Sequence, residues 1–130
     1  MTVSMNMPIL VVDDYRTMVR IIHNFLEQLG FTNLDEANDG AEAFEKMTLR
    51  KPRYGLVIAD WNMLPMSGYD LLKKVRADAD MARTPFILVT AESKRENVMA
   101  AKEAGVNNYI IKPFNAETLG FKLKAVLGDF

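Results

Sequence analysis

The chain has 130 residues, of which 49% are hydrophobic and 25% are charged, and its formal net charge at pH 7 is −1. These values are ordinary for one globular domain, and a charge so close to zero argues against a nucleic-acid or acidic-membrane partner held by bulk electrostatics. The lack of cysteine excludes disulfides and thiolate metal sites, no apolar run is long enough to span a membrane, and Met1–Met7 does not resemble a signal peptide.

The first half of the chain is predicted to alternate strand and helix. The apolar run Ile9–Val12 predicts a buried strand that ends at two aspartates. A helix is predicted next, because apolar residues recur at helical spacing: Met18, Ile21, Ile22, Phe25, Leu26 and Leu29. Residues 31–37 lack a continuous apolar run and predict a short strand at a sheet edge. Asp39 and Glu42 form a capping box, which predicts the start of a second helix.

The second half continues this alternation through three more strands. Each is a short apolar run that ends at a polar side chain: Leu56–Ala59 at Asp60, Phe86–Val89 at Thr90, and Tyr109–Ile111 at Lys112. The remaining helices are predicted to begin at caps: Ser67 with Asp70, Ser93 with Glu96, and Asn115. We predict a cis Lys112–Pro113 bond, because the chain leaves a buried strand there in a tight turn. Five such units predict an α/β fold, a doubly wound five-stranded parallel sheet with five helices, in a single domain over residues 1–130 without an output domain.

Polar side chains converge at one edge of this sheet, because the carboxyl ends of parallel strands lie on the same side. Asp13, Asp14 and Asp60 are therefore expected within a few ångströms of one another. Two unit charges about 5 Å apart repel by roughly 3 kcal/mol at an effective dielectric constant near 20, so three clustered carboxylates favour a hard divalent cation such as Mg²⁺. With that cation bound, Asp60 could attack phosphorus as a nucleophile while Lys112 and Thr90 hold the oxygens of the arriving group.

Four strings of residues, in order and at matching spacings, resemble the receiver domains of bacterial two-component response regulators. They are Ile9–Asp14, Asp60–Met63, Val89–Glu92 and Tyr109–Phe114. The resemblance covers the chain from Pro8 onward and is strongest to the single-domain chemotaxis regulators of that family. It implies a flavodoxin-like sheet with strand order 2-1-3-4-5.

The resemblance also implies how the acidic site works. Asp60 is the implied phosphoacceptor, and Lys112 is implied to contact the phosphoryl group. The implied direct ligands of Mg²⁺ are Asp14, Asp60 and the backbone carbonyl of Asn62, while Asp13 acts through a water molecule.

Further roles carried over from the family concern switching and output. Thr90 is implied to move toward the phosphoryl group as Tyr109 turns inward, and Asn62 and Glu92 correspond to positions that set how quickly the acyl phosphate hydrolyses. The implied output surface comprises the fourth predicted helix, the last strand and the last helix. On this chain it offers Lys94, Arg95, Val98, Lys102, Tyr109 and Lys122.

The implied function is that of a phosphorylated signalling protein, not an enzyme that turns over external substrates. The expected partners are a histidine kinase as donor, a flagellar switch protein or another phosphorylation-dependent target, and a phosphatase. We expect a cytoplasmic monomer that binds no nucleic acid and does not insert into membranes. An alternative stays open, in which the chain is an intermediate in a His–Asp phosphorelay or a phosphate sink with another partner.

Two other protein classes fit the residues less well. A phosphatase of the haloacid dehalogenase type needs a second aspartate two residues after the nucleophile, where this chain has Asn62. A flavodoxin-like cofactor carrier needs a phosphate-binding loop rich in Gly, Ser and Thr after the first strand, and none is present. The string Met63–Gly68 also departs from the family's usual Met-Pro-x-Met-Asp-Gly, because the proline stands one place later, at Pro65. The backbone path after Asn62 is therefore an open question.

Overall fold

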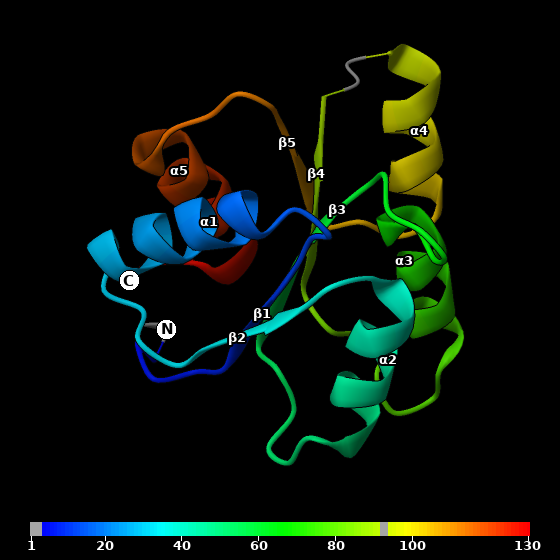
Figure 1. Ribbon diagram of the computed structural model, residues 1–130, viewed down its shortest axis with the longest axis horizontal. Helices are drawn as coiled ribbons and strands as arrows, with labels where there is room; N and C mark the ends of the chain where they lie inside the picture. The colour runs from blue at the N-terminus through cyan, green and yellow to red at the C-terminus, as the bar shows by residue number, and fades with distance from the viewer. Residues whose placement is uncertain (1–3, 92–93) are drawn as a thin grey trace.

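The computed structural model describes residues 4–91 and 94–130, which form one five-stranded parallel sheet and five helices (Figure 1). In chain order the elements are β1 (Ile9–Val12), α1 (Arg16–Gln28), β2 (Leu34–Ala37), α2 (Gly40–Leu49), β3 (Leu56–Asp60), α3 (Gly68–Ala77), β4 (Phe86–Thr90), α4 (Arg95–Glu103), β5 (Asn108–Ile111) and α5 (Ala116–Leu127). The strand order is β2-β1-β3-β4-β5, which confirms the predicted fold class. None of the helices in these two stretches is long and apolar enough to cross a membrane.

The order of the strands creates a switch point between β1 and β3. The chain passes from β1 outward to β2, then returns across β1 to β3 and continues outward to β5. Helices α1 and α5 cover one face of the sheet, and α2, α3 and α4 cover the other (Figure 1). Ligand sites in such sheets lie outside the carboxyl ends of the strands at the switch point, and here those ends carry the three aspartates.

The sheet is buried on both faces, which explains the unbroken apolar runs of its central strands. Successive side chains along each strand point to opposite faces. One set packs under α2, α3 and α4 and includes Leu10, Val12, Val57, Ala59, Phe86 and Leu88. The other packs under α1 and α5 and includes Ile9, Val11, Leu56, Ile58, Ile87, Val89 and Ile110. The strand ends are therefore fixed by a rigid core.

Three of the predicted helix caps form. A side-chain oxygen accepts a hydrogen bond from a backbone N–H three residues later at Asp39 from Glu42, at Ser67 from Asp70, and at Asn115 from Thr118. The fourth differs, since α4 begins at Arg95 after Lys94, whose side chain makes no capping bond. The predicted cap Ser93 lies outside the described residues.

The burial of α1 differs in detail from the sequence pattern. Ile22 and Leu26 are buried as expected, but Ile21 is exposed and Val19, which the pattern omitted, is buried. A single residue step turns an α-helix by about 100°, so Ile21 and Ile22 cannot both face the sheet. At the next strand, β2 occupies only the last four residues of the predicted segment 31–37, and Phe31 instead packs edge-on against Phe130.

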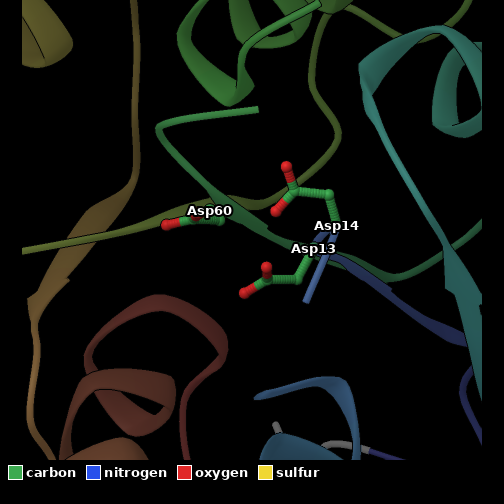
Figure 2. Close-up of side chains that lie close together, drawn as sticks. All are labelled: Asp13, Asp14 and Asp60. Carbon is green, nitrogen blue, oxygen red and sulfur yellow. The ribbon is translucent and has the colours of Figure 1, made fainter. Parts of the chain in front are cut away.

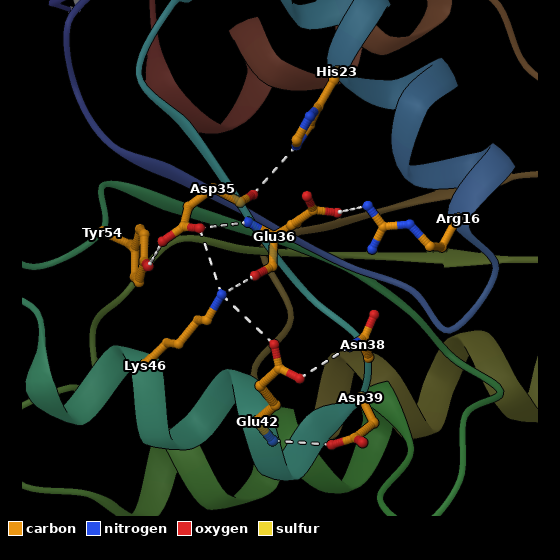
Figure 3. A network of polar contacts seen from close by, with 9 residues as sticks. All are labelled: Arg16, His23, Asp35, Glu36, Asn38, Asp39, Glu42, Lys46 and Tyr54. Atoms are coloured by element: carbon orange, nitrogen blue, oxygen red, sulfur yellow. Dashed lines mark hydrogen bonds and ion pairs between the residues drawn. The ribbon is translucent and has the colours of Figure 1, made fainter.

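The edge strand β2 is closed by side chains instead of by another strand (Figure 3). Asp35 accepts a hydrogen bond from the Glu36 N–H through its Oδ1, and Lys46 donates from Nζ to the Glu36 carbonyl. Lys46 also lies 3.6 Å from Asp35 Oδ1, so the two groups that cover the strand edge form an ion pair. His23 of α1 is half-buried, and its Nε2 lies 3.3 Å from the Asp35 carbonyl oxygen. This arrangement protects a free strand edge from pairing with another chain.

The predicted cis Lys112–Pro113 bond is confirmed. The Lys51–Pro52 and Leu64–Pro65 bonds are cis as well. The Leu64–Pro65 bond lies in the segment after Asn62 whose sequence departs from the family pattern.

Candidate functional site

The three predicted carboxylates meet at the ends of β1 and β3 (Figure 2). Asp13 and Asp14 directly follow β1, and Asp60 is the last residue of the neighbouring strand β3. One oxygen from each carboxylate lies within 4.8 Å of the other two. Asp13 and Asp60 are buried and Asp14 is exposed, so the cluster is open to solvent on the side of Asp14.

Asp13 is held in an environment that disfavours its charge. Its Oδ1 accepts a hydrogen bond of 3.0 Å from the Tyr15 N–H, whereas its Oδ2 is buried without a hydrogen-bond partner in the described part of the chain. Burial raises the pKa of Asp13 to about 6, Asp60 adds to that increase, and the Tyr15 N–H and Lys112 oppose it. A buried carboxylate oxygen without a hydrogen-bond donor, beside two further carboxylates, fits a hard divalent cation.

Lys112 closes the site from the side of β5. Its Nζ lies 3.1 Å from Asp60 Oδ1 and 3.9 Å from Asp13 Oδ2. Burial raises the pKa of Asp60, and the charge and hydrogen bond of Lys112 oppose that increase. The backbone N–H of Lys112 donates to the Thr90 carbonyl, which ties this residue to the end of β4.

Thr90 and Tyr109 lie on adjacent strands. Thr90 is the last residue of β4 and is buried, and Val89 beside it pairs in register with Asp60. Tyr109 lies on β5 opposite Leu88 and is half-buried, with the Nζ of Lys122 5.0 Å from the centre of its ring. Thr90 therefore belongs to the edge that carries the acidic cluster, whereas Tyr109 lies farther back along the sheet.

The residues expected to set the lifetime of a phosphoryl group are only partly described. Asn62 is exposed and lines an open cavity of about 330 Å³ together with Asp14 and three residues of the β3–α3 loop, Met63, Leu64 and Ser67. Glu92 lies outside the described residues. On the expected output surface, Lys94, Arg95 and Lys102 are exposed, while Val98, Tyr109 and Lys122 are half-buried.

Gly68 holds α3 against Asp60, a role that was not predicted from the sequence. A Cβ atom at Gly68 would lie 2.1 Å from the backbone carbonyl oxygen of Asp60. The Gly68 N–H also donates a 3.0 Å hydrogen bond to the Trp61 carbonyl, so the loop between them is closed on itself. The usable sequence signal was a glycine at the first helical position, where a side chain is normally tolerated.

Trp61, the residue after Asp60, is half-buried in a parallel stack with Tyr69 of α3, with ring centroids 5.0 Å apart. This contact also joins the residue after Asp60 to α3. The start of α3 therefore contacts the end of β3 twice, through the backbone at Gly68 and Asp60 and through the rings of Trp61 and Tyr69.

Comparisons with known proteins agree with this geometry. A family profile described as the response regulator receiver domain matches residues 9–124. The chemotaxis protein CheY-3 of Vibrio cholerae is 50% identical over 121 residues, which cover 93% of this chain and 92% of that protein. The solved structure of the V. cholerae chemotaxis protein CheY4 superposes with a TM-score of 0.85 at 31% identity, over 94% of this chain and 99% of that chain. A receiver domain of a sensor histidine kinase from Pseudomonas aeruginosa, with a magnesium ion coordinated in its active-site cleft, superposes with a TM-score of 0.83 at 26% identity, over 95% of this chain and 99% of that chain.

Proposed function

The chain belongs to the response regulator receiver family and is closely related to the CheY chemotaxis regulators, and from this premise we propose that Asp60 accepts a phosphoryl group from a histidine kinase. The observation that carries the proposal is the contact of 3.1 Å between Asp60 Oδ1 and Lys112 Nζ inside a cluster of three carboxylates. A carboxylate in that position is both a nucleophile and the neighbour of a fixed positive charge.

The residues of the site divide the chemistry between them. An Asp60 oxygen forms the new P–O bond as the bond from phosphorus to the donor breaks, and the electron pair of the broken bond stays with the donor. Lys112 neutralises charge on the oxygens of the transferred group, since phosphoryl transfer depends mainly on positioning and charge neutralisation. Thr90, at the neighbouring strand end, donates its hydroxyl to one of those oxygens.

The acidic cluster is proposed to hold Mg²⁺. Asp14, Asp60 and the backbone carbonyl of Asn62 are the proposed direct ligands, and Asp13 acts through a water molecule. Two observations support this assignment: the buried Oδ2 of Asp13 has no hydrogen-bond partner in the described residues, and the P. aeruginosa receiver domain holds a magnesium ion in its active-site cleft. When bound, the ion supplies positive charge that offsets the repulsion among the carboxylates and the phosphoryl oxygens.

A receiver domain of this kind is a signalling protein, not a classical enzyme. We propose that it catalyses only its own phosphorylation and dephosphorylation, and that Asn62 and Glu92 set the rate at which the acyl phosphate is lost. Thr90 and Tyr109 are proposed to couple the site to the output surface formed by α4, β5 and α5. A ligand shifts the equilibrium between two conformations only if it binds them differently. The Thr90 hydroxyl is proposed to supply that difference by binding the phosphoryl group in one of the two conformations.

The proposed setting is chemotaxis in the cytoplasm, with the chain acting as a monomer that binds a flagellar switch protein after phosphorylation. Its relation to CheY-3 supports this choice over a phosphorelay intermediate or a phosphate sink. A phosphatase is a further proposed partner.

Phosphorylation with a small donor tests the proposal. With acetyl phosphate and Mg²⁺, the wild-type chain is expected to gain one acid-stable, base-labile phosphoryl group, and EDTA or the substitution Asp60→Asn is expected to prevent this. Undiminished labelling of Asp60→Asn would refute the assignment. Pull-down of flagellar switch fragments by the phosphorylated chain then tests the partner, whereas onward transfer to a histidine-containing phosphotransfer protein would favour the phosphorelay.

A further inference from the structure

A basic cavity of about 400 Å³ lies at the end of α2, and the function proposed above does not use it. Its lining comes from β2, from α2 and from the segment that leads to β3: Asp35, Lys46, Leu49, Arg50, Lys51 and Tyr54. Three of these side chains are cationic and one is a carboxylate, in a chain whose formal net charge is −1. Because α2 ends here and the chain then enters the start of β3, the cavity lies towards the amino ends of the strands, whereas the acidic cluster lies at their carboxyl ends.

The carboxylate of this cavity is already satisfied. Asp35 Oδ2 accepts a hydrogen bond from the Tyr54 hydroxyl, as Figure 3 shows. The other oxygen, Oδ1, accepts from the Glu36 N–H and lies 3.6 Å from Lys46 Nζ. Lys46 Nζ also lies 3.6 Å from a carboxylate oxygen of Glu42. Asp35 and Lys46 are thus compensated by each other and by neighbours, and Asp35 is not the counter-charge of the remaining cations.

Arg50 is a cation without a counter-charge. Its guanidinium carbon lies 5.1 Å from the centre of the Tyr54 ring, and its Nε is buried without a hydrogen-bond partner in residues 4–91 and 94–130. The one other buried side-chain nitrogen or oxygen of these residues in that condition is Asp13 Oδ2, in the acidic cluster. Within the same residues, neither Arg50 nor the exposed Lys51 forms an ion pair. A cation that is partly removed from water costs free energy unless an anion compensates it.

The chemistry of these two side chains indicates the class of ligand. A guanidinium offers a planar fork of donors that matches two oxygens of a phosphate, and an ammonium adds a compact positive charge. Two uncompensated cations, adjacent in the chain, attract a dianion more strongly than a single carboxylate. The cavity also has an apolar wall, because Leu49 is 73% exposed. Its volume of about 400 Å³ leaves room for an organic group beside the phosphate.

We propose that this cavity binds a small phosphate monoester, whose phosphate is held by Arg50 and Lys51 and whose organic part covers Leu49. The ring of Tyr54 holds the guanidinium from one side, and the hydrogen bond to Asp35 fixes Tyr54 in turn. The site is separate from Asp60, and binding there requires neither Mg²⁺ nor phosphoryl transfer.

Calorimetric titration of the full chain with phenyl phosphate in EDTA tests the proposal, and inorganic phosphate is the second probe. EDTA removes divalent metal, so the acidic cluster cannot bind either probe through a bridging ion. The wild type is expected to bind one phenyl phosphate with a Kd of about 1 mM or below. Inorganic phosphate is expected to bind more weakly, because it cannot remove Leu49 from water.

Substitutions in the cavity separate its charged and apolar contributions. Arg50→Gln is expected to weaken the binding of both probes by about tenfold or more, and Lys51→Gln by about threefold to tenfold. Leu49→Ser is expected to weaken phenyl phosphate but not inorganic phosphate. Arg83→Gln is the matched control, because Arg83 is exposed in the segment between α3 and β4 and its replacement removes the same charge elsewhere. Its Kd is expected to equal that of the wild type.

The urea midpoint of each variant shows whether it folds, and if Arg50→Gln does not, Lys51→Gln and Leu49→Ser decide the question. A wild-type Kd above about 1 mM for phenyl phosphate would overturn the proposal. Equal losses in Lys51→Gln and Arg83→Gln would also overturn it, since they would show general attraction to positive charge. Binding that is lost in Lys112→Gln but kept in Lys51→Gln would place the probe at the acidic site and refute the assignment to this cavity.

Discussion

Replacing Asp13 by asparagine is expected to make the metal-free protein more stable. Asp13 is 1% exposed, and its pKa is raised from 3.8 to about 6 in the folded chain. Each unit of that difference corresponds to 1.36 kcal/mol, so at pH 7 the charged Asp13 disfavours folding by about 3 kcal/mol. Asparagine removes the charge and keeps an oxygen for the Tyr15 N–H that now donates to Asp13 Oδ1. We therefore expect a gain of up to about 3 kcal/mol.

The sign of the pH dependence follows from the direction of the pKa. Between pH 4 and pH 6 the folded protein keeps a proton on Asp13 that the unfolded chain has already released, so the free energy of unfolding falls as pH rises through this window. Below about pH 3.8, the pKa of Asp13 in the unfolded chain, the carboxyl is protonated in both states and no longer disfavours folding. Asp13→Asn should flatten this slope, although Asp60, whose pKa is also raised, keeps part of it.

The assay is urea unfolding followed by the fluorescence of Trp61, in EDTA and in excess Mg²⁺, between pH 4 and pH 8. At pH 7 in EDTA the urea midpoint of Asp13→Asn should rise by up to about 1.5 M if the slope is near 2 kcal/mol per M. Magnesium at a hundredfold excess over its dissociation constant should stabilise the wild type by about 2.7 kcal/mol, and the variant by less.

Asp14→Asn serves as the control, because Asp14 is exposed and its replacement in EDTA should change stability by less than about 1 kcal/mol. An Asp13→Asn protein that is less stable than the wild type in EDTA would refute the electrostatic reasoning. It would show that the ion pair with Lys112 and the hydrogen bond from the Tyr15 N–H outweigh the cost of burying the Asp13 charge.

Substitutions at Gly68, Arg76 and Thr90 test other parts of the structure. Gly68→Ala should lower the free energy of unfolding by about 3 kcal/mol in thermal unfolding, because the new Cβ would lie 2.1 Å from the Asp60 carbonyl oxygen. Gly120→Ala is the control and should lose little, because its Cβ meets only the end of the Leu29 side chain. Equal losses in the two variants would contradict this reasoning. Arg76→Met should destabilise the fold by about 2 to 3 kcal/mol in urea unfolding, because the guanidinium donates to the carbonyls of Gly105, Ala82 and Thr84 and to the Asn107 side chain; an unchanged midpoint would refute it. Thr90→Ala should still be phosphorylated but should bind the flagellar switch target more weakly in titrations of the phosphorylated form, and an affinity equal to that of the wild type would rule out this coupling route.

The parallel sheet and the acidic cluster were predictable for a physical reason, whereas the strand order was implied by the resemblance to receiver domains. Strands buried on both faces require continuous apolar runs, and a polar residue can follow such a run only where the strand leaves the core. Asp60, Thr90 and Lys112 mark the carboxyl ends of three strands, and parallel topology brings these ends to one edge of the sheet. The caps at Asp39 and Ser67 were readable too, because a capping bond is local in sequence.

The contacts that the sequence did not reveal depend on packing between distant segments. The close approach of Gly68 to Asp60 is set by where α3 docks, and a glycine at the first helical position does not by itself show which backbone atom it will meet. The closure of the β2 edge by Lys46 requires α2 to lie beside that strand. The burial of Met63 and the exposure of the next residue, Leu64, lie in a loop whose sequence departs from the family pattern, so the pattern did not reveal them.

Locating the phosphoryl group by tandem mass spectrometry tests the central claim most directly. The chain is phosphorylated by the kinase in Mg²⁺, the acyl phosphate is reduced with borohydride, and the peptides that contain each aspartate of the cluster are sequenced. We expect Asp60, whose Oδ1 lies 3.1 Å from Lys112 Nζ, to be converted to homoserine and Asp13 and Asp14 to remain aspartate. Reduction of Asp13, of Asp14 or of a residue outside the cluster, with Asp60 unchanged, would refute the assignment of Asp60 as the phosphoacceptor.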